Sequence, residues 1–285
     1  MNDFQSFAMA HGLQIDKLCP VNRVQRCATL EKPRSRNGAW FWDGVRGWVS
    51  DWAQGGELHW FDGGEIKVFT EAERKAWAQR KRAAEARQQH GWENAAIAAK
   101  ELVASCQPKD HNYLHSKGLG QLLGLVDPDG VLVVPMRHVI TNELQGAQRI
   151  VWLPEERCYE KKMLPGMRAK AAVFRLGTNR AQETILCEGY ATGLSIELAA
   201  RQLRLSASVL VCFSDGNMAH VAPMVKGRAY CFADNDKSGA GLRAAEKTGL
   251  PFCMSDTEGF DANDEHHKRG LMAVCAKLMA VRRMT

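Results

Sequence analysis

Acidic side chains lie at three places in the last third of the sequence where they could do chemistry together. Glu188 precedes Gly189, Asp234 and Asp236 have an i, i+2 spacing, and Asp261 begins a third acidic group. Carboxylates on neighbouring loops provide the oxygen ligands preferred by hard divalent cations, which in turn bind phosphate oxygens. This pattern therefore predicts a Mg²⁺ or Mn²⁺ site held by Glu188, Asp234, Asp236 and Asp261.

The elements that must position these acids follow an alternating pattern. Apolar runs predict strands over 184–187, 208–213 and 228–233, and helical patterns cover 191–203, 238–247 and 263–279. Such alternation predicts an α/β fold with a parallel, doubly wound sheet, in which ligands gather at the carboxyl ends of the strands. Taken singly, Asp261 could be an ordinary helix N-cap and Asp234 with Asp236 a surface turn.

The three acidic groups resemble the motifs of the TOPRIM fold, which has a Rossmann-like parallel sheet. Glu188-Gly189-Tyr190 follows one strand, Asp234-Asn235-Asp236 follows another, and Asp261-Ala262-Asn263-Asp264 precedes a helix. Bacterial-type primases, topoisomerases, RecR-like proteins and OLD-type nucleases share this fold. The resemblance implies metal binding by Asp234, Asp236 and Asp261, with Glu188 as a metal ligand or a base.

Segments upstream of the acids are similar, in the same order, to bacterial replicative primases over roughly residues 109–270. The similar segments are Tyr113-Leu114 with Lys117-Gly118-Leu119, Val134–Arg137, Gly146–Arg149 and Lys162–Gly166. The resemblance implies a mixed α+β primase subdomain before the TOPRIM unit. It also implies that Arg137, Arg149 and Lys162 hold template or triphosphate, and we add Lys237 to this set.

Two positions depart from the cellular primases within the TOPRIM unit. Thr192 stands four residues after Glu188, where those enzymes carry another acid, and Asn263 stands where a second aspartate is common. Both departures reduce the negative charge, so the number of bound metals stays open. Asp264 or Glu197 are candidates to compensate.

The N-terminal segment is predicted to be a small β-rich module. Five tryptophans lie between residues 40 and 60, and Arg34 and Arg36 precede Trp40 and Trp42. Such basic and aromatic residues could grip phosphates and stack bases, or the tryptophans could form the core of the module. Two short segments, 10–13 and 36–39, resemble the leader region of small phage and mobile-element primases.

We expect no zinc in this module. A zinc ribbon needs four ligands in two close pairs, whereas this segment offers only Cys19, Cys27, His11 and His59 at unsuitable spacings.

Charge and cysteine content indicate a polyanionic partner and a reducing compartment. The net charge is +6, and residues 1–180 hold all of the excess, because residues 181–285 contain 12 basic and 12 acidic side chains. A basic part beside a neutral part fits a protein that binds a polyanion with one part and does chemistry with the other. The nine cysteines show no C-x-x-C pair. No apolar run is long enough to cross a bilayer, so we expect a cytoplasmic protein.

Together these observations predict a DNA primase of a phage, plasmid or other mobile element, with single-stranded DNA and nucleoside triphosphates as substrates. The predicted parts are a template-binding module (1–69), a helical linker (70–108), a primase subdomain (109–180) and a TOPRIM domain (181–285). We expect no helicase-binding domain, which leaves a replicative helicase as a partner in trans. The alternatives are a metal-dependent nuclease and a non-catalytic single-stranded-DNA-binding accessory protein. A topoisomerase is disfavoured, since no tyrosine falls outside the segments already assigned.

Overall fold

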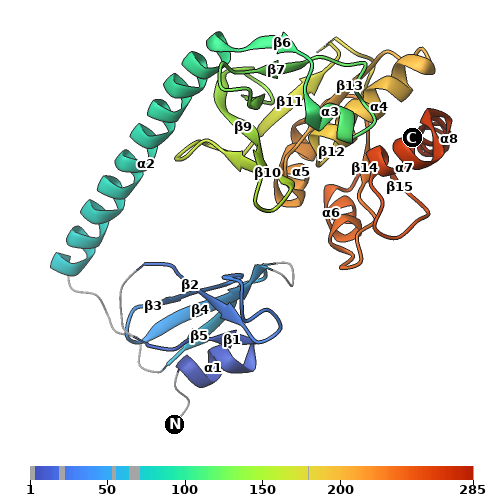
Figure 1. Ribbon diagram of the computed structural model, residues 1–285. Helices are drawn as coiled ribbons and strands as arrows, with labels where there is room; N and C mark the ends of the chain where they lie inside the picture. Colours follow the sequence, from blue (N-terminus) through green and yellow to red (C-terminus); the bar gives the residue numbers. More distant parts are fainter. Residues whose placement is uncertain (1–3, 19–22, 53–55, 64–70, 179, 285) are drawn as a thin grey trace. The chain divides into compact units, whose positions relative to one another are not determined.

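The computed structural model describes residues 4–18, 23–52, 56–63, 71–178 and 180–284. The chain divides into two compact units, Met1–Ala78 and Gln79–Thr285, and each is considered by itself (Figure 1). Among the described residues, none of the helices combines the length and the apolar character that a membrane span requires.

The first unit contains a five-stranded sheet of consecutive strands. Its elements are α1 (Phe4–Ala10), β1 (Leu13–Gln14), β2 (Gln25–Thr29), β3 (Gly38–Trp42), β4 (Arg46–Asp51) and β5 (His59–Asp62). Each strand pairs antiparallel with the next. Phe4, Trp40 and Val49 are buried in its core. The prediction of a small β-rich module is therefore confirmed.

One helix, α2 (Glu71–Ser105), continues without interruption for 35 residues. Its sequence is rich in Ala, Glu, Lys, Arg and Gln and lacks proline, which favours an unbroken helix. A predicted capping box at its start involves Thr70, which lies outside the described residues. Ala95 and Ala99 are buried near its C-terminal end, and the Arg168 guanidinium lies 4.9 Å from the ring of Trp92.

Seven strands and a short helix precede the acidic segments in the second unit. They are β6 (Gln107–Lys109), α3 (Asn112–Ser116), β7 (Gly124–Val126), β8 (Leu132–His138), β9 (Leu144–Leu153), β10 (Cys158–Met163), β11 (Ala172–Leu176) and β12 (Glu183–Cys187). From β6 to β11 the pairings are antiparallel, which makes the mixed subdomain that was predicted.

The C-terminal part adds three strands to β12 and alternates them with helices. These elements are α4 (Tyr190–Gln202), β13 (Ala207–Val211), α5 (Asp215–Val221), β14 (Arg228–Ala233), α6 (Ala240–Thr248), β15 (Phe252–Met254), α7 (Ala262–Arg269) and α8 (Leu271–Arg282). The strand order is β13-β12-β14-β15, all parallel, and β11 joins antiparallel to β13. The predicted α/β fold with a parallel sheet is confirmed.

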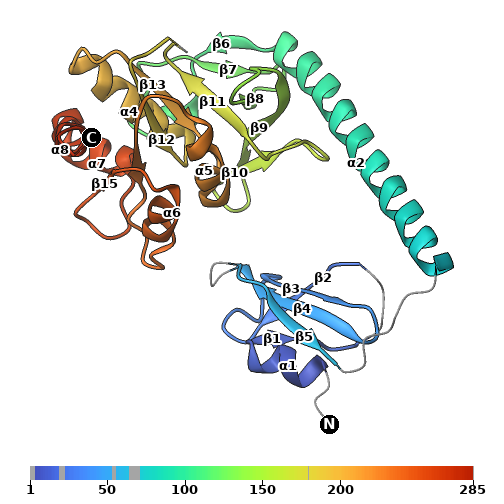
Figure 2. The ribbon, with the colours of Figure 1, turned by 180° about the vertical axis from the view of Figure 1, so that it is seen from behind.

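Helices cover both faces of this parallel sheet (Figure 2). On one face, Ile185 and Val211 pack with side chains of α4 and α8, including Ile196 and Leu278. On the other face, strand side chains such as Leu186 pack with α5 and α6. The sheet is therefore buried on both faces, and its strand ends are the places where polar side chains can gather.

The predicted single helix over 263–279 is wrong in one respect. Gly270 separates α7 from α8, and its φ of 87° lies in a region that L side chains rarely adopt. The Gly270 amide donates to the carbonyl of His266, which closes α7 before α8 begins.

Candidate active site

The strand order places two of the predicted acids at one crevice. β12 and β14 are parallel neighbours, but the chain leaves β12 toward β13 and leaves β14 toward β15. Ligands of doubly wound sheets bind at such a point, outside the carboxyl ends of the strands. Glu188 directly follows β12 and Asp234 directly follows β14.

Burial and mutual repulsion dominate the electrostatics of this pair. Desolvation, followed by repulsion from Asp261 and Asp215, raises the pKa of Asp234 to about 7. Desolvation also raises the pKa of Glu188 to about 8, with contributions from the charge of Asp215, a hydrogen bond shared with it, and Asp234. Carboxyl groups near such values retain protons at neutral pH and can exchange them with a substrate or a cation.

Asp215 is an acid of this site that sequence reasoning missed. It begins α5, just beyond the end of β13, and its carboxylate faces Glu188. The strand over 208–213 was predicted, so applying the strand-end rule to this third strand would have found Asp215. Three neighbouring parallel strands thus each contribute one carboxyl group to the same edge.

Lys161 is the cation that lies against these acids. Desolvation and repulsion from Lys117 lower its pKa, whereas the charges of Asp261, Glu188 and Asp234 act in the opposite direction. The sequence-based choice was its neighbour Lys162, which forms an ion pair of 2.6 Å with Glu160. Successive residues of a strand point to opposite faces, so the two lysines cannot have the same role. A pattern of two adjacent lysines does not reveal which one faces the site.

The Asp236 carboxylate is occupied as a cap of α6. It accepts hydrogen bonds from the backbone amides of Ser238 (2.9 Å), Ala240 (3.2 Å) and Gly241 (2.7 Å). Its partial burial acts to raise its pKa, but a hydrogen bond from the Ser238 hydroxyl, together with those from the amides, lowers the pKa below its usual range. Gly241 is required here, because any Cβ on it would overlap the Asp234 carbonyl oxygen.

Asp261 is the N-cap of α7, and both of its carboxylate oxygens have partners. Oδ1 accepts from the Asp264 amide at 2.8 Å, and Oδ2 accepts from the Thr192 hydroxyl at 2.8 Å. Asp264 completes a capping box with the Asp261 amide. Thr192, which replaces an acid of the cellular primases, therefore acts as a hydrogen-bond donor to Asp261.

The second departure, Asn263, and the second candidate for compensating charge, Glu197, are both engaged in other contacts. Asn263 is 2% exposed, and its amide nitrogen donates to the carbonyl of Lys117 at 2.9 Å and to the Ser195 hydroxyl at 3.1 Å. Glu197 pairs with Arg201 on α4. An aspartate at position 263 would lack both donor hydrogens, which explains an amide there.

The acids fit a Mg²⁺ ion held by few protein ligands. Asp234 Oδ1 is buried and has no hydrogen-bond partner among the described residues, and the repelling carboxyl groups of Asp261, Asp215 and Asp236 lie near it. No three His, Cys, Asp or Glu side chains in the described ranges are placed so that they could hold a metal ion by themselves. Mg²⁺ usually retains waters and binds one or two carboxylates together with substrate phosphates, so Asp234 and Glu188 suffice as protein ligands.

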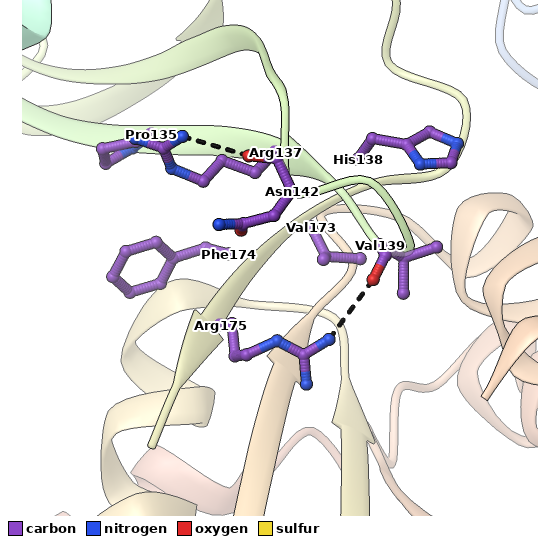
Figure 3. A pocket seen from close by; sticks show the side chains of 8 residues that line it. All are labelled: Pro135, Arg137, His138, Val139, Asn142, Val173, Phe174 and Arg175. Atoms are coloured by element: carbon purple, nitrogen blue, oxygen red, sulfur yellow. Dashed lines mark hydrogen bonds between the residues drawn. The ribbon is translucent and has the colours of Figure 1, made fainter. Parts of the chain in front are cut away.

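Two further predicted cations, Arg137 and Arg149, are engaged with other partners. Arg137 is on β8. It donates to the Asn142 carbonyl at 3.1 Å and lines a pocket that also contains Arg175 (Figure 3). Arg149 pairs with the buried Asp127 at 3.4 Å. Lys237 is exposed in the loop that carries Asp236.

In the first unit, the predicted stacking residues Trp40 and Trp42 pack in or against the core. Trp40 is only 5% exposed, and the half-buried Trp42 ring stacks on Phe4 at 4.8 Å. Among the tryptophans of this unit whose side chains are described, Trp52 and Trp60 are exposed, and the Arg26 guanidinium lies 4.6 Å from the Trp52 ring. Arg34 and Arg36 are exposed. Of the four residues considered as zinc ligands, Cys19 lies outside the described residues.

No match was found among curated proteins. A structure of bacteriophage T7 lagging-strand DNA polymerase interacting with primase domains of two gp4 subunits bound to an RNA/DNA hybrid and dTTP includes a chain with 14% identity and a TM-score of 0.41. That similarity covers 62% of this chain and 91% of the other.

The structure of the DnaG catalytic core has 15% identity and a TM-score of 0.38, over 53% of this chain and 52% of that one. This chain therefore spans about half of the DnaG core. In sequence, residues 183–270 match the Toprim domain family. The matched range begins at β12 and ends after α7, so it contains every acid of the crevice, and residues 183–270 are a Toprim domain.

Proposed function

We propose that this protein is a primase that joins nucleotides on a single-stranded DNA template. The observation that carries the proposal is the pairing of Glu188 and Asp234 at the crevice, with Lys161 facing them. The collinear primase-like segments at 113–119, 134–137, 146–149 and 162–166 support a primase over other Toprim proteins. The resemblance of residues 10–13 and 36–39 to small mobile-element primases favours replication of a phage, plasmid or similar element.

Each residue of the crevice has a part in this proposal. A bound Mg²⁺ or Mn²⁺ would neutralise charge on the transferring phosphoryl group. Asp234 would hold the ion, and Glu188 would either hold it as well or accept the proton of the attacking 3′-hydroxyl. Lys161 would bind a phosphate oxygen.

The remaining site residues have indirect parts. Asp236 and Asp261 would hold α6 and α7 in place, since their carboxylates bond to these helices. Arg137, Arg149, Lys162 and Lys237 are proposed as outer contacts with template or triphosphate. Because Thr192 and Asn263 replace acids, we expect fewer bound ions than a site with both acids would hold.

The test is template-directed synthesis on single-stranded DNA with labelled ribo- or deoxyribonucleotides and Mg²⁺ or Mn²⁺. We expect Glu188→Gln and Asp234→Asn to reduce product by at least about 100-fold, as expected when proton transfer or charge stabilisation is lost. Asp129→Asn, on an exposed turn, is the matched control and should retain synthesis.

Other outcomes contradict the proposal in distinguishable ways. Shortened template would indicate a nuclease. DNA binding that is insensitive to chelator, without incorporation under either metal, would indicate an accessory protein. Synthesis at the wild-type rate by Asp234→Asn would refute the site assignment.

A further inference from the structure

A pocket of about 810 Å³ lies on the upstream part of the second unit. Residues of β6, α3, β7, β9 and β10 line it, and none of the acids assigned above is among them. Three of its lining residues carry aromatic rings: Trp152 on β9, Tyr159 on β10 and His111 before α3.

The three rings form a supported platform. Trp152 and Tyr159 are cross-strand partners, and their ring centroids lie 4.9 Å apart. His111 lies 6.1 Å from Tyr159, and its ring is held by the Tyr113 amide at 3.1 Å and the Gly130 carbonyl at 3.2 Å. Beneath them, the buried Tyr113 contacts Tyr159 edge-on at 5.2 Å.

The platform is accessible although its support is rigid. Trp152 is 47% exposed, which is high for a tryptophan that packs against another aromatic ring. Exposed aromatic faces in a groove are the means by which single-stranded nucleic acids are bound without sequence preference, because every base has a π-face.

The strand register connects this platform to the crevice. Tyr159 and Lys161 are two residues apart on β10, so their side chains share one face and lie about 7 Å apart along the strand. Lys161 in turn faces Glu188 and Asp234. A strand with a phosphate on Lys161 therefore has an adjacent base within reach of Tyr159 and Trp152.

The charges around the pocket are compatible with a nucleic acid. Lys109 contributes an exposed ammonium group to the rim. Of the two acids in the lining, Asp127 pairs with Arg149 at 3.4 Å, and Asp110 hydrogen-bonds His115 at 2.6 Å. These pairings reduce the repulsion that the two carboxylates would exert on phosphates.

We propose that Trp152, Tyr159 and His111 form a stacking site for nucleobases of single-stranded DNA next to the crevice. The choice of DNA strand rests on the proposed function, but the stacking itself requires only a base and a neighbouring phosphate. A free nucleoside triphosphate offers the same chemistry, so the experiment measures both ligands separately.

The first arm measures equilibrium binding of the full-length protein, in chelator, to a fluorescently labelled oligothymidylate of about 12 nucleotides, a length within the range of known single-strand sites. We expect Trp152→Ala to weaken binding roughly 5- to 100-fold and Trp152→Phe to retain most of the wild-type affinity. The same oligonucleotide without bases should bind wild type and Trp152→Ala equally. Leu123→Ala, another exposed apolar residue of this unit, is the control and should bind like wild type.

The second arm measures binding of a fluorescent nucleoside triphosphate to the same proteins. We expect Trp152→Ala to leave it within about twofold of wild type. The stacking site is refuted if Trp152→Ala and Trp152→Phe bind the oligonucleotide as wild type does. It is also refuted if Trp152→Ala weakens binding of the base-free strand as much as binding of the normal oligonucleotide. Loss of triphosphate binding alone would overturn the assignment to a strand. Because neither arm requires catalysis, a chain that fails in primer synthesis can still pass both.

Discussion

Asp234 should make the metal-free protein less stable as the pH rises, and Asp234→Asn should remove this effect. Burial and neighbouring acids raise the pKa of Asp234 from 3.8 to about 7. In the unfolded chain the carboxyl group ionises near its ordinary value, so between about pH 4 and 7 the folded state holds a proton that the unfolded state has released. Stability contributed by this group is therefore complete below about pH 4 and lost as the pH rises to 7.

The size of this effect follows from the two pKa values. At about 1.4 kcal/mol per pH unit, a pKa raised from 3.8 to about 7 corresponds to about 4 kcal/mol. Asparagine does not titrate, so the free energy of unfolding of Asp234→Asn relative to wild type should rise by about this amount between pH 4 and pH 8. Any cost of burying the amide is the same at both pH values and cancels in the comparison.

The assay is urea denaturation of the full-length protein in chelator, followed by far-UV circular dichroism at several pH values. Asp256→Asn is the control, because a hydrogen bond and the charge of Lys277 lower the pKa of Asp256. Its pH effect therefore has the opposite sign and lies below about pH 4, so between pH 4 and pH 8 its stability relative to wild type should stay constant. Adding Mg²⁺ at about 100 times its dissociation constant should return about 3 kcal/mol to wild type at pH 8 and less to Asp234→Asn. A stability difference between Asp234→Asn and wild type that does not change with pH would refute the reasoning.

Four other substitutions test separate contacts. Lys161→Ala should lower primer synthesis at least about 10-fold by removing a phosphate contact beside the acids, whereas Lys162→Ala, which removes only an outer contact, should lower it less, as measured by nucleotide incorporation. Asn263→Asp should destabilise the protein by about 3 kcal/mol in thermal or urea unfolding, since a buried carboxylate cannot donate to the Lys117 carbonyl; unchanged stability would contradict that role. Gly241→Ala should cost about 1–3 kcal/mol in the same measurement, and a milder effect would show that the loop can move away from the added methyl group.

The sequence predicted the α/β alternation of residues 183–270, because most strands and helices there have clear apolar patterns, but it did not predict α5, β15 or the break at Gly270. It also located Glu188 and Asp234, since a strand-end rule requires only the strand boundaries. It could not show that Asp236 and Asp261 turn their carboxylates toward backbone amides, because an acid that caps a helix and an acid that binds a metal occupy the same kind of position.

Other differences arise from tertiary contacts with no local signal. Whether Lys161 or Lys162 faces the acids depends on the register of β10 against β9. Trp40 is buried because α1 covers its side of the sheet with Phe4, and the local sequence does not specify which face a preceding helix will cover.

The Toprim region depends on elements outside its own limits, because β11 pairs with β13 and α8 packs against its core. Residues 183–270 are recognisable in sequence, but β13 completes its hydrogen bonds with β11, and Val274, Cys275, Leu278 and Val281 of α8 fill one side of the core. Cutting the chain at the limits of the match would expose an unpaired strand edge and an uncovered apolar face, both of which promote aggregation. The segment that matches the Toprim family, residues 183–270, is thus shorter than the segment that pairs all of its strands and covers its core.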